Sequence, residues 1–231
     1  MRKLMKGKKL NFTIIELLMV ISVIFILASL LLPSLKQARN KASTIVCTSN
    51  LKQMGQTFHL YGTDFNGMAP PFSTSLSGHD DILWSTLLWP YLYGDKNTAY
   101  NVPGYNGQYS VGINKKTIFA CPSRDAKSAS GHSTWFISYG LNYRFAEPVG
   151  HYLQTPYRFT RNQQASKTAA VIDSYSACAA SGELNPYILD ASKRHSNGNN
   201  VLYSDMHAAW KKFTDFPSHD MNIFWRYNGV N

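Results

Sequence analysis

The stretch FTIIELLMVISVIFILASLLLP occupies residues 12–33 and contains a single charged side chain, Glu16. As a helix, residues 12–32 would be about 31 Å long, which matches the roughly 30 Å hydrocarbon core of a bilayer. A lone carboxylate within a membrane segment usually has a function and a partner. The alternative is a solvated Glu16 at the level of the lipid headgroups, where its charge complements the helix dipole.

The flanks of this segment indicate a retained membrane helix. Residues 1–11 contain five basic side chains and no acid, so the positive-inside rule places this end in the cytoplasm. A cleaved signal peptide is disfavoured because its apolar region is shorter, about 7–15 residues, and ends at a small-x-small site. Here Ile26 and Leu27 precede Ala28, which spoils such a site. The rest of the chain shows no basic face or nucleic-acid motif, so no nucleic-acid partner is expected.

The helical pattern continues beyond the membrane segment. Pro33 is expected to kink the helix, because proline removes a backbone hydrogen bond and crowds the preceding turn. Apolar residues then recur at helical spacing from Ala38 to Tyr61, and the helix is expected to stop near Gly62, before the turn-like TDFNG at 63–67. This stripe is predicted to cover a sheet.

The remaining residues predict a β-rich globular domain. Residues 80–94 are apolar at near-helical spacing and predict a short helix. Stretches rich in aromatic and β-branched residues predict strands at 116–121, 134–143, 167–173, 200–205 and 207–213. The expected fold is α+β, with a long N-terminal helix packed on a small antiparallel β-sheet. Its parts are a leader at 1–11, a transmembrane helix at 12–32, its amphipathic continuation at 33–66 and the globular domain at 67–231.

Three cysteines are present, Cys47, Cys121 and Cys178, and none lies in a C-x-x-C pair. This spacing disfavours zinc and thioredoxin-like sites, so no metal or cofactor is predicted. Cys47 lies on the helical stripe and Cys121 ends a predicted strand, so both should face the helix–sheet seam. In an oxidising compartment we expect them to form a disulfide and to leave Cys178 free. The alternative is a pair of reduced thiols that pack as small apolar residues.

The order of these features resembles the type IV pilin and pseudopilin superfamily. The basic leader, the residues Phe12-Thr13-Ile14-Ile15-Glu16 and the apolar helix broken at Pro33 carry the resemblance. It implies that a prepilin peptidase cleaves between Asn11 and Phe12 and methylates the new N-terminus. It also implies that Glu16 serves assembly by pairing with the α-amine of a neighbouring subunit. Asn11 departs from the Gly of most members, and cleavage after Gly7 would put Phe12 where the Glu belongs.

Segments nearer the C-terminus resemble a subgroup of prepilin-like proteins. FACPS at 119–123 and SYGLNY at 138–143 have counterparts there, and RHSNGNNVLYSDM at 194–206 resembles its H-x9-D-G signature, with His195 and Asp205. Met206 replaces the expected Gly, although a tight hairpin turn favours residues that tolerate positive φ. SNGN at 196–199 predicts a hairpin loop that would hold His195 roughly 17 Å from Asp205. We therefore expect loop hydrogen bonds for His195 and no catalytic dyad. The alternative is a wider loop, which would bring His195 and Asp205 together.

These features together predict a structural subunit, not an enzyme, of a type II secretion or type IV pilus-like system. The expected location is the inner membrane, with a single span, a cytoplasmic N-terminus and an extracytoplasmic domain. The expected partners are a prepilin peptidase, other pilin-like subunits, the assembly machinery and the membrane. Two alternatives stay open. One is a membrane-anchored binding protein whose tryptophans stack on glycans. The other is an anchored hydrolase, for which no G-x-S-x-G motif is present.

Overall fold

The computed structural model describes residues 13–71, 73–74, 82–94, 117–123, 138–142, 148–149, 153–154, 158–159, 162–175, 178–179, 191–217 and 222–225. The chain divides into two compact units, Met1–Arg39 and Asn40–Asn231. Asn11 and Phe12, where processing is expected, lie outside the described residues.

Helix α1 spans Ile14–Asp64 and contains Pro33 in its interior. The proline therefore does not end the helix, and the expected kink stays a prediction. The helix ends at Asp64, two residues beyond the expected Gly62. The turn that follows is closed by a hydrogen bond of 2.7 Å from the Gly67 N–H to the Gly62 carbonyl. Asn66 and Gly67 follow with φ of 52° and 78°, a left-handed conformation typical of helix C-termini. The predicted long helix and its terminal turn are thus confirmed.

Among the described residues, the main sheet contains five strands in the order β7-β3-β6-β8-β9. All neighbours pair antiparallel except β3 and the edge strand β7, which are parallel. The bounds are β3 Tyr139–Asn142, β6 Ala169–Asp173, β7 Cys178–Ala179, β8 Gly198–Tyr203 and β9 Ala208–Lys212. Four of the five predicted strand regions coincide with strands of this sheet, and the α+β class is confirmed.

Several smaller elements lie before, between and after these strands along the chain. Helix α2, Trp84–Tyr93, confirms the helix predicted over residues 80–94. Two short antiparallel pairs are β1 with β2 and β4 with β5. Their bounds, with those of two 3₁₀ helices, are β1 Ser73–Thr74, β2 Ile82–Leu83, β4 Pro148–Val149, β5 Leu153–Gln154, η4 Lys193–His195 and η5 Phe213–Asp215.

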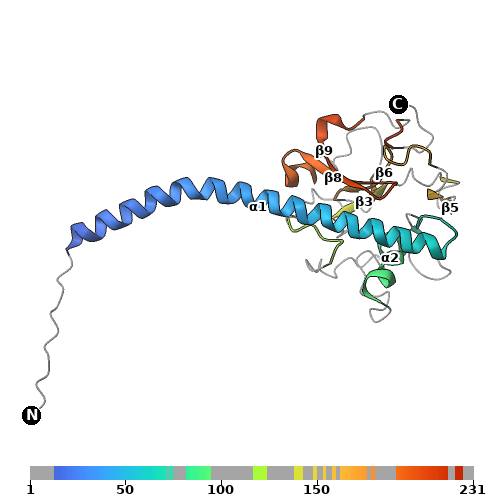
Figure 1. Ribbon diagram of the computed structural model, residues 1–231, viewed down its shortest axis with the longest axis horizontal. Coiled ribbons are helices and arrows are strands. Elements are labelled where there is room, and N and C mark those ends of the chain that lie inside the picture. The colour runs from blue at the N-terminus through green and yellow to red at the C-terminus, as the bar shows by residue number, and fades with distance from the viewer. Residues whose placement is uncertain are drawn as a thin grey trace, which may run out of the picture. The chain divides into compact units, whose positions relative to one another are not determined.

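The core forms where the C-terminal part of α1 covers the sheet (Figure 1). Leu51, Met54 and Phe58 are fully buried there, and each such side chain contributes about 1.5–3 kcal/mol relative to exposure. They share one hydrophobic cluster with sheet residues that include Leu141, Val171 and Leu202. The part of α1 that covers the sheet begins at Cys47 and not at Ala38 as predicted. Ala38 and Ala42 are exposed, and Ile45 is 69% exposed.

The segment 116–121 is not the predicted strand. Its described residues form a turn in which Ala120 N–H donates to the Thr117 carbonyl at 3.2 Å. Phe119, Ala120 and Cys121 are all buried, whereas consecutive side chains of a strand point to opposite faces. The aromatic and β-branched composition therefore reflects burial in the core and not a sheet ladder.

The turn between β8 and β9 packs closely on α1. A Cβ atom added to Gly55 would lie 3.1 Å from Leu202 Cδ1 and 3.2 Å from Met206 Cβ. Met206 itself has φ of 68°, which is costly for a residue with a large side chain. Met206 thus stands where the sequence resemblance predicted a Gly, and Gly55 of the facing helix provides the space.

Gly55→Leu is expected to lower the free energy of unfolding by about 2 kcal/mol, because overpacking at this contact outweighs the gain in helix propensity. Urea unfolding of the full chain in detergent measures the change. Gln56→Leu is the matched control, since Gln56 is exposed on the same helix, and it should change stability by less than about 0.5 kcal/mol. Equal stability of the two variants would contradict the close packing of the turn on the helix.

Candidate functional site

Glu16 lies in the first turn of α1, where it forms a capping box with Thr13. The Glu16 carboxylate accepts hydrogen bonds from the backbone N–H and the hydroxyl of Thr13, both at 2.9 Å. Glu16 N–H in turn donates to the Thr13 hydroxyl at 3.3 Å. These reciprocal bonds satisfy backbone donors that the helix itself leaves unpaired. Helix capping is therefore a structural role of Glu16, and any assembly role must act in addition to it.

The N-terminal half of α1 presents an apolar surface on all sides. Among the described residues, α1 is the one helix long and apolar enough to span a membrane, and no residue of its most apolar stretch is buried. Ile14, Ile15, Met19, Phe25 and Leu30 are all more than 60% exposed. A helix that is apolar on every face requires lipid or other helices around it.

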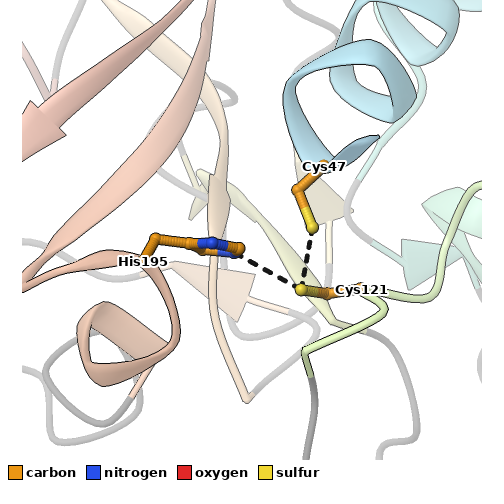
Figure 2. Close-up of side chains that lie close together, drawn as sticks. All are labelled: Cys47, Cys121 and His195. Atoms are coloured by element: carbon orange, nitrogen blue, oxygen red, sulfur yellow. Dashed lines mark hydrogen bonds between the residues drawn. The ribbon is translucent and has the colours of Figure 1, made fainter. Parts of the chain in front are cut away.

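Cys47 and Cys121 come together in the core, from α1 and from the turn at 117–123 (Figure 2). Both are free thiols, and the Cys47 S–H group donates to the Cys121 sulfur across 2.8 Å. They are separated by 74 positions in the sequence, and packing of the turn against α1 brings them into contact. The predicted proximity is therefore present, and the disulfide itself stays a prediction.

His195, at the end of η4, lies beside this cysteine pair (Figure 2). Its Nε2 atom is 3.3 Å from the Cys121 sulfur. Its Nδ1 atom is 3.2 Å from the Thr44 hydroxyl, which donates to the Asn40 carbonyl at 3.0 Å. The imidazole is thus held from both sides and is almost completely buried. Spacing along the sequence pointed to loop hydrogen bonds for His195 and missed its contact with the cysteines.

Asp173 and Arg194 extend the cluster. Asp173 Oδ2 lies 3.5 Å from His195 Nε2 and accepts two hydrogen bonds from Asn200, through its backbone N–H at 2.6 Å and its side chain at 2.9 Å. The guanidinium of Arg194 donates to the carbonyls of Ser138 and Ser174, at 3.4 Å and 3.1 Å. A buried carboxyl group and a buried guanidinium therefore flank the thiols and the imidazole.

The protonation of the pair follows from these contacts. The hydrogen bond that Cys47 donates to Cys121 raises the pKa of Cys47, and burial adds to the effect. The same bond lowers the pKa of Cys121, and the hydrogen bond from His195 and the charge of Arg194 outweigh the opposing effect of burial. Burial lowers the pKa of His195, but the hydrogen bond to Cys121 and the charge of Asp173 raise it overall. Of the two thiols, Cys121 is therefore the more readily ionised.

The two signature residues His195 and Asp205 do not share a site. They lie beyond opposite ends of β8, and the exposed carboxylate of Asp205 pairs with the ring Nδ1 of His207. The hairpin loop predicted at Asn197-Gly198 is wrong, because β8 pairs with β9 from Gly198 to Leu202 and the turn falls at 204–207. Ser196 and Asn197 instead have positive φ of 58° and 62° and link η4 to β8.

The tryptophans of the described residues pack mainly in the core. Trp84, Trp89 and Trp225 are buried. Trp210 is 45% exposed, and its indole N–H donates to the His195 carbonyl at 2.9 Å. A row of exposed aromatic rings suited to a sugar chain is therefore not present among these four side chains.

Comparison of the chain with protein-family models, curated proteins and solved structures finds no match.

Proposed function

We propose that the chain is a pilin-like or pseudopilin structural subunit that assembles through its N-terminal helix in a type II secretion or type IV pilus-like system. A prepilin peptidase removes residues 1–11, and the helix then lies in the inner membrane with the globular domain on the extracytoplasmic side. Its partners are other pilin-like subunits and the assembly machinery. It has no catalytic role in this proposal.

The observation that carries the proposal is that α1 has two structural roles. One end of this helix exposes an apolar surface suited to lipid or to other helices, while Leu51, Met54 and Phe58 at the other end build the domain core. A cleaved signal peptide would be separate from the fold, whereas α1 contributes residues to both parts of the chain. This helix is continuous over 51 residues, Ile14–Asp64.

Glu16 supports the proposal by its position. It is the only charged residue between residues 12 and 33, and its carboxylate lies one turn into the helix. A positive α-amine created on Phe12 of a neighbouring subunit would provide the partner that an intramembrane carboxylate needs. Until a neighbouring subunit provides this partner, the hydrogen bond from Thr13 holds the carboxylate at the start of the helix.

The proposal predicts that the mature chain begins at a methylated Phe12. Intact-mass analysis of the full-length protein, expressed with a prepilin peptidase, measures this directly. Asn11→Gly restores the residue common in the superfamily and should be cleaved at least as completely as the natural chain. A mature protein that begins at Met1, or one cut beyond Ala28, would contradict the proposal.

A further inference from the structure

We propose that the cluster of Cys47, Cys121 and His195 is a binding site for a thiophilic cation, Zn²⁺ foremost, while its thiols are reduced. The three ligand atoms lie within 4.8 Å of one another and all three residues are buried. They come from α1, the turn at 117–123 and η4 (Figure 2), so the site exists only in the folded domain. The proposal goes beyond assembly and does not rest on it.

The ligand types and distances suit Zn²⁺. Thiolate sulfur and imidazole nitrogen are its preferred donors, and tetrahedral coordination places sulfur and nitrogen roughly 3.5 Å apart and two sulfurs roughly 3.8 Å apart. The distance from Cys121 to His195 Nε2 is 3.3 Å, close to this value. The sulfurs, at 2.8 Å, would separate by about 1 Å to admit the metal or approach by about 0.8 Å to bond. Metal binding and the disulfide therefore exclude each other.

The hydrogen bonds around His195 orient it as a ligand. The Thr44 hydroxyl donates its proton to the Asn40 carbonyl, so towards the imidazole it acts as an acceptor. Nδ1 therefore carries a hydrogen, and the neutral ring presents the lone pair of Nε2 to the cysteine side. A second hydrogen bond of this kind typically fixes the tautomer of a metal-bound histidine.

Asp173 lies next to His195 but outside the group of three ligand atoms. Its Oδ2 atom is 3.5 Å from His195 Nε2, and Oδ1 is buried with no hydrogen-bond partner among the described residues. The ligand atoms that lie within 4.8 Å of one another belong to Cys47, Cys121 and His195. Structural zinc sites are closed by four protein ligands, so the Asp173 carboxylate would have to move towards the cysteines to become the fourth.

Titration of the full-length protein in detergent with Co²⁺ tests the proposal, after complete reduction confirmed by thiol alkylation and mass analysis. We expect one Co²⁺ per chain, a thiolate-to-cobalt charge-transfer absorption, and its loss on addition of Zn²⁺. Cys47→Ser and Cys121→Ser should remove the absorption, whereas the control Cys178→Ser should keep it. No charge-transfer absorption in the reduced natural chain, or an unchanged one in Cys121→Ser, would overturn the proposal.

Two measurements decide the matter even if the cysteine variants fold poorly. Thr44→Val keeps the shape of a partly exposed side chain and removes the partner of Nδ1, so Co²⁺ affinity should fall by roughly 10- to 100-fold. Oxidation of the natural chain should abolish binding altogether. Unchanged affinity in Thr44→Val would refute the orienting role of the Thr44 hydroxyl, and binding by the oxidised chain would refute ligation by the cysteines.

Discussion

Glu16→Gln is expected to abolish assembly with other pilin-like subunits while the helix still enters the membrane. Glutamine is accepted at this position of a capping box, so the hydrogen bonds with Thr13 are largely retained. The substitution removes only the negative charge that we propose to pair with the α-amine of a neighbouring subunit. At about 4 Å and an effective dielectric constant near 20, such a pair contributes about 4 kcal/mol, or roughly a thousandfold in the equilibrium constant of one contact.

The measurement is the recovery of assembled subunits, by cross-linking in membranes and by counting filaments or complexes. Thr13→Ala is the matched control, because it removes the hydroxyl hydrogen bonds of the cap, which Glu16→Gln largely keeps, without removing the charge. Loss of the cap costs about 1 kcal/mol of helix stability and should leave most assembly intact. Normal assembly of Glu16→Gln would leave the chain as a membrane anchor only. Equal loss in both variants would show that assembly depends on the conformation of the helix start and not specifically on the charge.

Oxidised protein from the extracytoplasmic compartment is expected to contain a disulfide between Cys47 and Cys121, with Cys178 free. The sulfurs are already in contact in the core, and the compartment is oxidising under the proposed location. The bond would join positions 74 apart in the sequence. On the chain-entropy model it stabilises the fold by about 4 kcal/mol. Non-reducing peptide mapping identifies the pair, and urea unfolding before and after reduction measures its contribution.

Comparison of the oxidised and reduced natural chain measures the contribution of the disulfide to stability without the packing changes that a substitution would cause. Reduction should not change the free energy of unfolding of the double variant Cys47→Ser/Cys121→Ser, because this variant has no Cys47–Cys121 bond to reduce. Cys178→Ser should keep the full difference between oxidised and reduced protein. Three free thiols in exported protein, or a bond to Cys178, would contradict this prediction.

Local patterns along the chain were sufficient to predict the helices and most strands. The spacing of Leu51, Met54 and Phe58 follows the period of a helix, and these three side chains are buried on one face of α1. The aromatic and β-branched composition around β6, β8 and β9 likewise predicted strands. Both signals arise from neighbours in sequence, whose relative directions follow directly from backbone geometry.

Some positions are decided by packing partners that lie far away in the sequence. Residues 117–121 have the composition of a strand, but three consecutive side chains there are buried and the segment turns. The SNGN segment carries a strong hairpin signal, yet β8 pairs with β9 across a later turn that contains Met206. The register with β9 and the contact with Gly55 override the local preference.

The amino-acid sequence by itself determined the apolar helix with Glu16, the α+β class and the inward direction of Cys47, because each depends on residues a few positions apart. Only the tertiary structure decided that His195 and Asp173 join the two cysteines. His195 follows Cys121 by 74 positions, and no periodicity links residues on a helix, a turn and a 3₁₀ helix. Their meeting depends on how α1, the sheet and η4 pack together, and packing is a property of the whole domain.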